Sequence, residues 1–137
     1  MKISTKGRYA LRLMLDIALC GGEEPVRLSD AAKRQGISVK YLEQIVGTLT
    51  RAGCLKSVRG PQGGYRLMKE PEEYTAGEIL RVTEGSLAPV ECLEAETNLC
   101  PRADSCATLI LWKKLDQAVQ HVLDGCTLRD LMEWSRS

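Results

Sequence analysis

The chain has 137 residues, of which 44% are hydrophobic and 27% are charged, and its formal net charge is +1. This composition excludes a disordered chain and indicates one domain, or one domain with an extension. No apolar run approaches the roughly 20 residues of a membrane-spanning helix, and the first 16 residues lack a signal peptide's apolar run. We therefore expect a cytoplasmic protein without a membrane partner.

The small net charge conceals a difference between the two halves of the chain. Residues 1–69 carry 13 Lys and Arg against 5 Asp and Glu, a net charge of +8, and residues 70–137 carry 6 against 13, a net charge of −7. A basic half favours a polyanionic partner such as nucleic acid, although surface charges that merely segregate would give the same totals.

A first helix is predicted from Ser4 or Thr5, which can cap it, to about Leu19, and the two following glycines end it. Its apolar residues cover much of the helix circumference, although Asp16 interrupts them. A helix with this pattern is largely buried in a globular domain.

Two shorter helices and a hairpin follow. Ser29 is predicted to cap a helix over residues 30–35, and Ser38 is predicted to cap a helix over residues 39–52. Alternating residues on both sides of a glycine-rich turn predict a hairpin over residues 55–68. A short helix, a tight turn, a capped helix and a hairpin form the order of a winged helix-turn-helix.

The acidic half is predicted to be mostly helical. A capping box at residues 75–78 opens a helix that reaches about Glu84. Residues 86–105 have no periodicity, a long helix is predicted over residues 107–123, and residues 127–130 cap a last helix.

The helix-turn-helix and the hairpin point to DNA. The second helix of such a pair can lie in the major groove with its N-terminal residues at base edges, and an arginine at a hairpin tip can enter the minor groove. An ordinary α+β domain with a glycine-rich hairpin is the alternative, but the basic charge of this half favours nucleic acid. The candidate contacts are Ser38, Lys40, Tyr41 and Gln44 on the helix and Arg59 on the hairpin.

Three cysteines, Cys92, Cys100 and Cys106, fall within 15 residues of the non-periodic segment. Thiolates that converge from a loop bind an iron–sulfur cluster or zinc, and three unligated thiols are the alternative. The single histidine, His121, lies about 22 Å along the predicted helix from Cys106, so it cannot share a centre with Cys106 in one chain and is expected at the surface.

The remaining cysteines, Cys20, Cys54 and Cys126, lie at the ends of predicted elements near apolar residues, where we expect them to be buried. One histidine without a matched nucleophile or acid–base pair gives no catalytic arrangement. We therefore expect neither an enzyme nor a small-molecule substrate.

The long helix has a wide apolar face that an identical helix could cover across a two-fold axis. Packing against the first helix of the same chain is the alternative, and both can hold. A dimer would present two helix-turn-helix units to a palindrome. The face consists of Leu111, Trp112, Leu115, Ala118, Val119, Val122 and Leu123.

Several segments carry a resemblance to a known family. They are residues 3–10, 35–38, 41–44 and 57–65, together with the cysteine loop that precedes Leu111 and Trp112. Over nearly the whole chain the sequence resembles the Rrf2 family of bacterial transcription regulators. It is most similar to the IscR-like branch, which regulates genes of iron–sulfur cluster assembly. NsrR-like nitric oxide sensors and CymR-like regulators of cysteine metabolism are related branches.

The resemblance implies a homodimer that binds a double-stranded, palindromic operator. The implied targets are genes of iron–sulfur cluster assembly or related cysteine, iron or stress genes. It also implies that Glu43 discriminates between classes of operator. The implied DNA contacts are Tyr41, Gln44, Ser57, Arg59, Gly60 and Pro61.

The resemblance further implies that Cys92, Cys100 and Cys106 hold a 2Fe–2S cluster that modulates DNA affinity or site choice. The fourth ligand is open, because the histidine position of IscR-like proteins is Leu109 here and the acidic position of NsrR-like proteins is Arg8. The alternative is the same regulator without a cluster, which senses cysteine oxidation, nitric oxide or a protein partner. Candidates for the fourth ligand are Glu91, Asp104, a residue of the partner chain and an exogenous thiol.

The expected fold is therefore mainly α with a small β-hairpin wing. Residues 1–85 form the winged helix-turn-helix domain, with the helix-turn-helix at about 28–52 and the wing at about 55–68. Residues 86–106 form the cysteine loop, and residues 107–137 form a dimerisation helix and a C-terminal helix.

Overall fold

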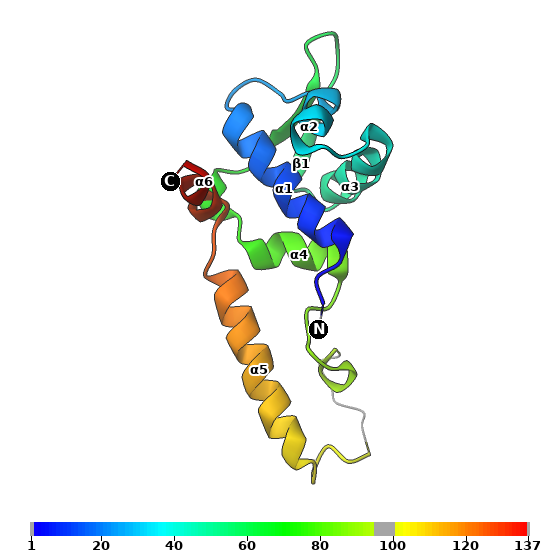
Figure 1. Cartoon of the computed structure of the whole chain (residues 1–137), viewed down its shortest axis with the longest axis vertical. Helices are drawn as coiled ribbons and strands as arrows, with labels where there is room; N and C mark the ends of the chain where they lie inside the picture. The colour runs from blue at the N-terminus through cyan, green and yellow to red at the C-terminus, as the bar shows by residue number, and fades with distance from the viewer. Residues whose placement is uncertain (1, 95–100, 137) are drawn as a thin grey trace.

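The computed structural model describes residues 2–94 and 101–136. Within these residues the fold is mainly α with one β-hairpin, as the sequence predicts, and Figure 1 shows its arrangement. The helices are α1 (Thr5–Cys20), α2 (Leu28–Gln35), α3 (Val39–Arg51), α4 (Ala76–Glu84), α5 (Ala107–Asp124) and α6 (Leu128–Arg136). The strands are β1 (Leu55–Val58) and β2 (Gly64–Leu67), and the 3₁₀ turns are η1 (Pro71–Glu73) and η2 (Glu91–Leu93).

Side-chain caps start most of the predicted helices. The hydroxyls of Ser4, Ser38 and Thr75 each accept a hydrogen bond from the backbone N–H three residues later, which confirms these caps. The predicted cap at Ser29 is wrong, because α2 begins one residue before it. The N-cap of α2 is Arg27, whose carbonyl oxygen accepts the first hydrogen bonds of the helix.

The core is built around α1, which contacts α2, α3, α4, α6 and β2 and runs through the middle of the body in Figure 1. Its predicted burial is confirmed, because the apolar side chains of its inner face are almost fully enclosed. Apolar burial of this kind supplies most of the stability of a small domain. The largest fully buried side chains are Tyr74, Leu13, Met14, Leu42, Ile45, Leu49, Leu55, Ile79, Leu80 and Leu128.

The long helix α5 extends away from this body (Figure 1). Its principal packing partner is α4 rather than α1, which does not favour the predicted packing on the first helix. Arg81 of α4 donates to Asp124 at 2.7 Å and to Gln120, so the attachment lies at the C-terminal end of α5. No helix among the described residues is both long and apolar enough to span a bilayer.

Candidate nucleic-acid interface and cysteine segment

The N-terminal end of α3 presents a polar face to solvent. Four apolar residues of α3 face the core, so the opposite side of the helix is exposed. The hydroxyl of Ser38 accepts the N–H of Tyr41 at 3.1 Å, which leaves its own O–H free to donate. Of the predicted contacts, Ser38, Lys40, Glu43 and Gln44 are exposed and Tyr41 is half-buried.

The ring of Tyr41 is held against α1. It meets the ring of Tyr9 edge to face, with centroids 5.8 Å apart and planes at 84°. The guanidinium of Arg12 lies 5.2 Å from the centre of the Tyr9 ring and donates to the side chain of Gln35 at 3.0 Å. Edge-to-face and cation–π contacts each contribute about 0.5–1 kcal/mol. They fix the first turn of α3 relative to the end of α2.

A buried carboxylate fixes α2 on α1. Asp16 is 3% exposed and accepts two hydrogen bonds from Arg34, at 3.0 and 2.8 Å, and one from Gln35, at 3.0 Å. This hydrogen bonding to Asp16 raises the pKa of Arg34 above its ordinary value. A buried charge is tolerated only when it is paired and hydrogen-bonded in this way. From the sequence, Asp16 was expected only to interrupt the apolar residues of the first helix, and its pairing with Arg34 was not predicted.

The hairpin is an exposed wing. Its strands pair from Leu55 opposite Leu67 to Val58 opposite Gly64. At the tip, Gly60 has a φ of 104°, a left-handed conformation that favours glycine, and its carbonyl oxygen accepts the N–H of Gly63 at 2.9 Å. The predicted contacts Ser57, Arg59, Gly60 and Pro61 are all exposed.

The wing is anchored to the residues that precede α2. Val26 and Tyr65 exchange two backbone hydrogen bonds of 2.8 Å, and Arg27 donates a hydrogen bond to the carbonyl oxygen of Pro61. Gly64 makes this approach possible, since a Cβ atom there would lie 2.3 Å from the Val26 oxygen. Sequence reasoning missed these contacts, because no local pattern signals a pairing across almost 40 residues.

Two further basic residues lie on the wing and are not among the DNA contacts predicted from the sequence. Lys56 and Arg66 are directly opposite each other in the two strands, and both are exposed. Like charges directly opposite in a sheet destabilise it. A polyanion that lies along the wing would relieve this repulsion, so the pair agrees with a nucleic-acid partner.

The described part of the cysteine segment places two of the three predicted ligands. Cys92 lies in η2 and Cys106 is the N-cap of α5, whereas Cys100 lies outside the described residues. The Thr108 hydroxyl, 3.2 Å from the Cys106 sulfur, and the backbone N–H of Leu109 lower the pKa of Cys106. Both described thiols are free and partly exposed.

These donors suit a soft-ligand centre, since a lowered pKa favours the thiolate that iron and zinc bind. Within residues 2–94 and 101–136, however, no three His, Cys, Asp or Glu side chains come together as a metal site requires. Leu109 is 6% exposed, so the position three residues after Cys106 is apolar and enclosed. Glu91, Asp104 and Arg8 are exposed, and so is His121, as predicted.

The other cysteines differ from one another. Cys54 is 3% exposed, as predicted, and burial raises its pKa. Cys126 is partly buried, and burial also raises its pKa. The prediction for Cys20 is wrong, because this thiol is exposed: the last turn of α1 extends past the core, where Leu19 is also 39% exposed.

The apolar face of α5 is uncovered in the single chain. Only Leu109 of this helix is buried. Exposed apolar patches of this kind mark interaction surfaces in soluble proteins. The large exposed residues on the helix are Ile110 (62%), Leu111 (56%), Leu115 (40%) and Val122 (67%).

Comparisons with known proteins agree with this arrangement. Residues 3–134 match the model of the Rrf2 family, described as iron-dependent transcriptional regulators. Protein Rrf2 of Nitratidesulfovibrio vulgaris is 44% identical over 96% of this chain and 87% of its own length. The regulator CymR of Bacillus subtilis is 46% identical over 98% and 92% of the two chains. The regulator IscR of Aliivibrio salmonicida is 43% identical over 96% and 77%.

Solved structures give the same result. The structure of CymR, titled the global cysteine regulator of B. subtilis, superposes with a TM-score of 0.82 at 46% identity, over 98% of both chains. IscR of T. potens gives a TM-score of 0.79 at 41% identity, over 98% of this chain and 88% of that one. The oxidized form of Staphylococcus aureus CymR gives a TM-score of 0.77 at 41% identity, over 97% of both chains.

Proposed function

We propose that this chain, which belongs to the Rrf2 family of transcriptional regulators and is not an enzyme, binds a palindromic operator as a homodimer in the cytoplasm. The proposal rests on one arrangement: the polar end of α3 and the wing are both exposed, and contacts from α1 and from residues 26–27 hold them in place. Both belong to the half of the chain with a net charge of +8.

The polar face of α3 supplies the base readout. Gln44 is of the type that pairs with adenine in the major groove, and Glu43 can accept from cytosine and so discriminate between operators. Ser38, Lys40 and Tyr41 bind phosphates or base edges beside them. The wing follows the backbone, and Arg59 enters the minor groove where Gly60 and Pro61 allow close approach, with Ser57 on a phosphate.

The dimer forms through α5. This helix extends away from the body of the chain in Figure 1, and a second copy covers its exposed apolar side chains in an isologous helix pair. The two-fold axis of that pair then relates two α3 helices, as a palindromic operator requires. Size-exclusion chromatography with light scattering is expected to give twice the chain mass of 15.1 kDa.

Cys92, Cys100 and Cys106 hold an iron–sulfur cluster of the 2Fe–2S type in this proposal. The family description, the IscR relatives and the lowered pKa of Cys106 support it. A cluster held by these cysteines would supply a redox-sensitive and iron-dependent group beside the start of α5. Since Leu109 cannot ligate iron, Glu91, Asp104, a residue of the partner chain or an exogenous thiol completes the shell.

Such a cluster would regulate operator binding by thermodynamic linkage. If the dimer with the cluster and the dimer without it differ in shape, gain or loss of the cluster changes operator affinity by the difference between the two binding free energies. The genes controlled are those of iron–sulfur cluster assembly or related cysteine, iron or stress genes.

Anaerobic purification tests the cluster. We expect a brown protein with visible absorbance and equal amounts of iron and sulfide, which Cys92→Ala or Cys106→Ala removes. Cys126→Ala is the matched control, because this thiol lies outside the cysteine segment. A colourless, iron-free protein from iron-replete anaerobic cells would contradict the cluster.

A second candidate keeps DNA binding but replaces the cluster with thiol oxidation, nitric oxide sensing or a protein partner. The CymR relatives, one of them crystallised in an oxidized form, favour it, and so does the partly exposed Cys106. In the cluster-free protein, iodoacetamide should label Cys106 much faster than Cys54, whose thiol is buried and has a raised pKa. If oxidation then abolishes operator binding in wild type but not in Cys106→Ala, thiol sensing is the mechanism.

A further inference from the structure

Tyr74 joins the two ends of the wing. Its ring is fully buried, and its hydroxyl accepts the backbone N–H groups of Met68, at 2.8 Å, and Lys69, at 3.1 Å. The same hydroxyl donates to the carbonyl oxygen of Cys54 at 2.7 Å. Cys54 directly precedes β1 and Met68 directly follows β2, so one side chain sets the spacing between the two strands at their base.

The backbone of the same residue joins the junction between α5 and α6. The carbonyl oxygen of Tyr74 accepts the N–H of Leu128 at 3.0 Å, and Ala76 donates to the carbonyl oxygen of Cys126 at 2.8 Å. Between them, Thr75 and Thr127 form an antiparallel bridge. The segment that starts α4 is therefore paired with the segment that ends α5.

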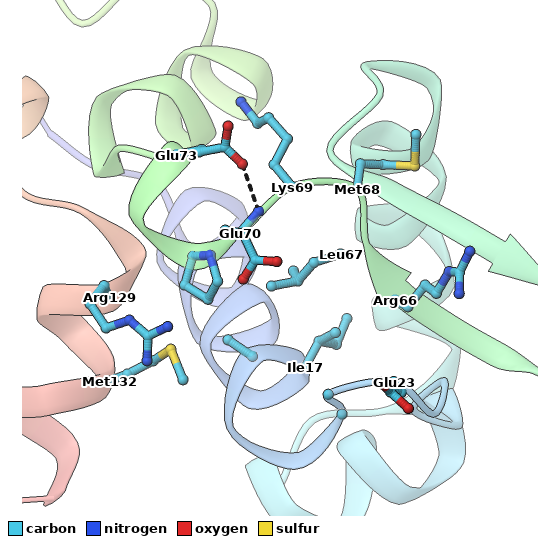
Figure 2. A pocket seen from close by; sticks show the side chains of 14 residues that line it. Ile17, Glu23, Arg66, Leu67, Met68, Lys69, Glu70, Glu73, Arg129 and Met132 are labelled. Carbon is cyan, nitrogen blue, oxygen red and sulfur yellow. Dashed lines mark hydrogen bonds between the residues drawn. The ribbon is translucent and has the colours of Figure 1, made fainter.

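Around this link the wing base and α6 are separated by an open cavity of about 540 Å³. Figure 2 shows Met132 and Arg129 of α6 on one side of the cavity and residues 66–70 on the other. Beside the cavity, Arg129 donates to Glu72 at 2.9 Å, but this ion pair is solvent-exposed and contributes little. The hydroxyl of Tyr74 is the stronger connection, because its hydrogen bond to Cys54 is buried in the low-dielectric core and those from Met68 and Lys69 are part-buried.

Lys69 strengthens the same connection. Its ammonium lies 4.6 Å from the centre of the Tyr74 ring and forms a 2.9 Å ion pair with Glu78 of α4. The wing base is thus held by both the ring and the hydroxyl of Tyr74.

We propose that Tyr74 is a positioning residue for operator binding, which transmits a displacement of α5 to the base of the wing. A shift at the end of α5 moves residues 126–128, and their hydrogen bonds to residues 74–76 carry it to the Tyr74 hydroxyl and the strands. The effect of this coupling on operator binding rests on the proposed function of the wing, whereas the coupling between α5 and the wing can be measured without DNA.

Amide hydrogen exchange on the full-length protein tests the coupling. Four proteins are compared: wild type, Tyr74→Phe, Asp124→Asn and the double variant. Asp124→Asn loosens the attachment of α5 to Arg81, and Tyr74→Phe keeps the ring but removes the hydroxyl. In the wild-type background we expect Asp124→Asn to speed exchange several-fold at both Leu128 and Lys69. In Tyr74→Phe, the Lys69 amide should exchange about tenfold faster than in wild type. Adding Asp124→Asn to this background should speed exchange at Leu128 but cause no further change at Lys69.

A matched control is Tyr65→Phe, the same chemical change on β2, which should leave the response of Lys69 to Asp124→Asn intact. The proposal is overturned if Asp124→Asn changes exchange at Lys69 by the same factor in both backgrounds, or does not change it in wild type.

If Tyr74→Phe does not fold, Thr127→Val in the wild-type background asks the same question. This change loosens the junction from the other side by removing the hydroxyl that accepts the N–H of Asp130. Faster exchange at Lys69 supports the coupling, and unchanged exchange there contradicts it. If the coupling is found but no operator is bound, only the proposed function fails.

Discussion

Arg27 donates a hydrogen bond to the backbone carbonyl oxygen of Pro61, so the N-cap residue of α2 also holds the tip of the wing. The two parts of the proposed interface are thereby connected to each other. The first helix of the helix-turn-helix and the wing cannot move independently while this contact and the Val26–Tyr65 bridge persist.

Arg27→Ala is therefore expected to weaken operator binding without removing a phosphate contact. We expect affinity to fall about three- to tenfold, or about 0.7–1.4 kcal/mol, the net size of one typical hydrogen bond. Because the variant and wild type release the same number of counterions on binding DNA, the slope of log affinity against log salt concentration should stay the same. Fluorescence anisotropy over a salt series measures both quantities. A changed slope would mean that Arg27 contacts DNA itself.

Arg59→Ala should behave differently. Arg59 is exposed at the wing tip and forms no ion pair with the described residues, so its charge is available to DNA. Affinity should fall about tenfold or more, and the salt slope should decrease by about 1. The same salt series checks this, and Lys113→Ala on α5 is a control of equal charge outside the interface. Unchanged affinity for a mapped operator would remove the wing from the mechanism.

Gly64→Ala is expected to detach the wing from the residues before α2. The added Cβ would lie 2.3 Å from the Val26 oxygen, so the bridge must open. We expect a loss of about 1–3 kcal/mol in the free energy of unfolding, measured by urea denaturation. Gly47→Ala on α3 is the control, because only the flexible end of Arg51 lies near its Cβ. It should leave stability unchanged or raise it by up to about 1 kcal/mol. Equal stability of the two variants would contradict the tight approach at Gly64.

The Arg81–Asp124 pair should give stability that depends on pH in a defined direction. The hydrogen bonds that Arg81 donates to Asp124 hold the pKa of this carboxyl below its ordinary value of 3.8. Because the pKa of Asp124 is lower in the folded than in the unfolded protein, the Arg81–Asp124 pair stabilises the fold at pH values above the ordinary pKa. This stabilisation is lost as the pH falls through the lowered pKa of the folded protein. Both side chains are more than a third exposed, so the contribution is below about 1 kcal/mol.

Wild type should therefore be slightly more stable than Asp124→Asn at pH 7, and this difference should disappear as the pH falls through the lowered pKa of Asp124. Thermal unfolding over a pH series measures it. A difference that grows as the pH falls would contradict the assignment.

Local signals allowed much of the fold to be predicted from the sequence. Ser38 and Thr75 cap the predicted helices because a cap depends only on residues three positions apart. The predicted cap at Ser29 is wrong because a serine can equally lie inside the first turn of a helix. The N-cap of α2 is Arg27.

Contacts distant in the sequence could not be predicted. No pattern connects Asp16 to Arg34, Arg27 to Pro61 or Tyr74 to Cys54, yet these pairs fix the helix-turn-helix and the wing. Each depends on the tertiary arrangement rather than on periodicity. The exposure of the α3 residues, by contrast, follows directly from the apolar spacing of that helix.

Operator binding is most directly tested by fluorescence anisotropy with two duplexes, one from the promoter region of the protein's own gene and one of scrambled sequence. The anaerobically isolated protein and the same protein stripped of iron are titrated in parallel. We expect specific binding at least about 1,000-fold tighter than binding to the scrambled duplex, with a different operator affinity for the two forms. Equal, weak binding of both duplexes by both forms would contradict a cluster-regulated operator-binding protein.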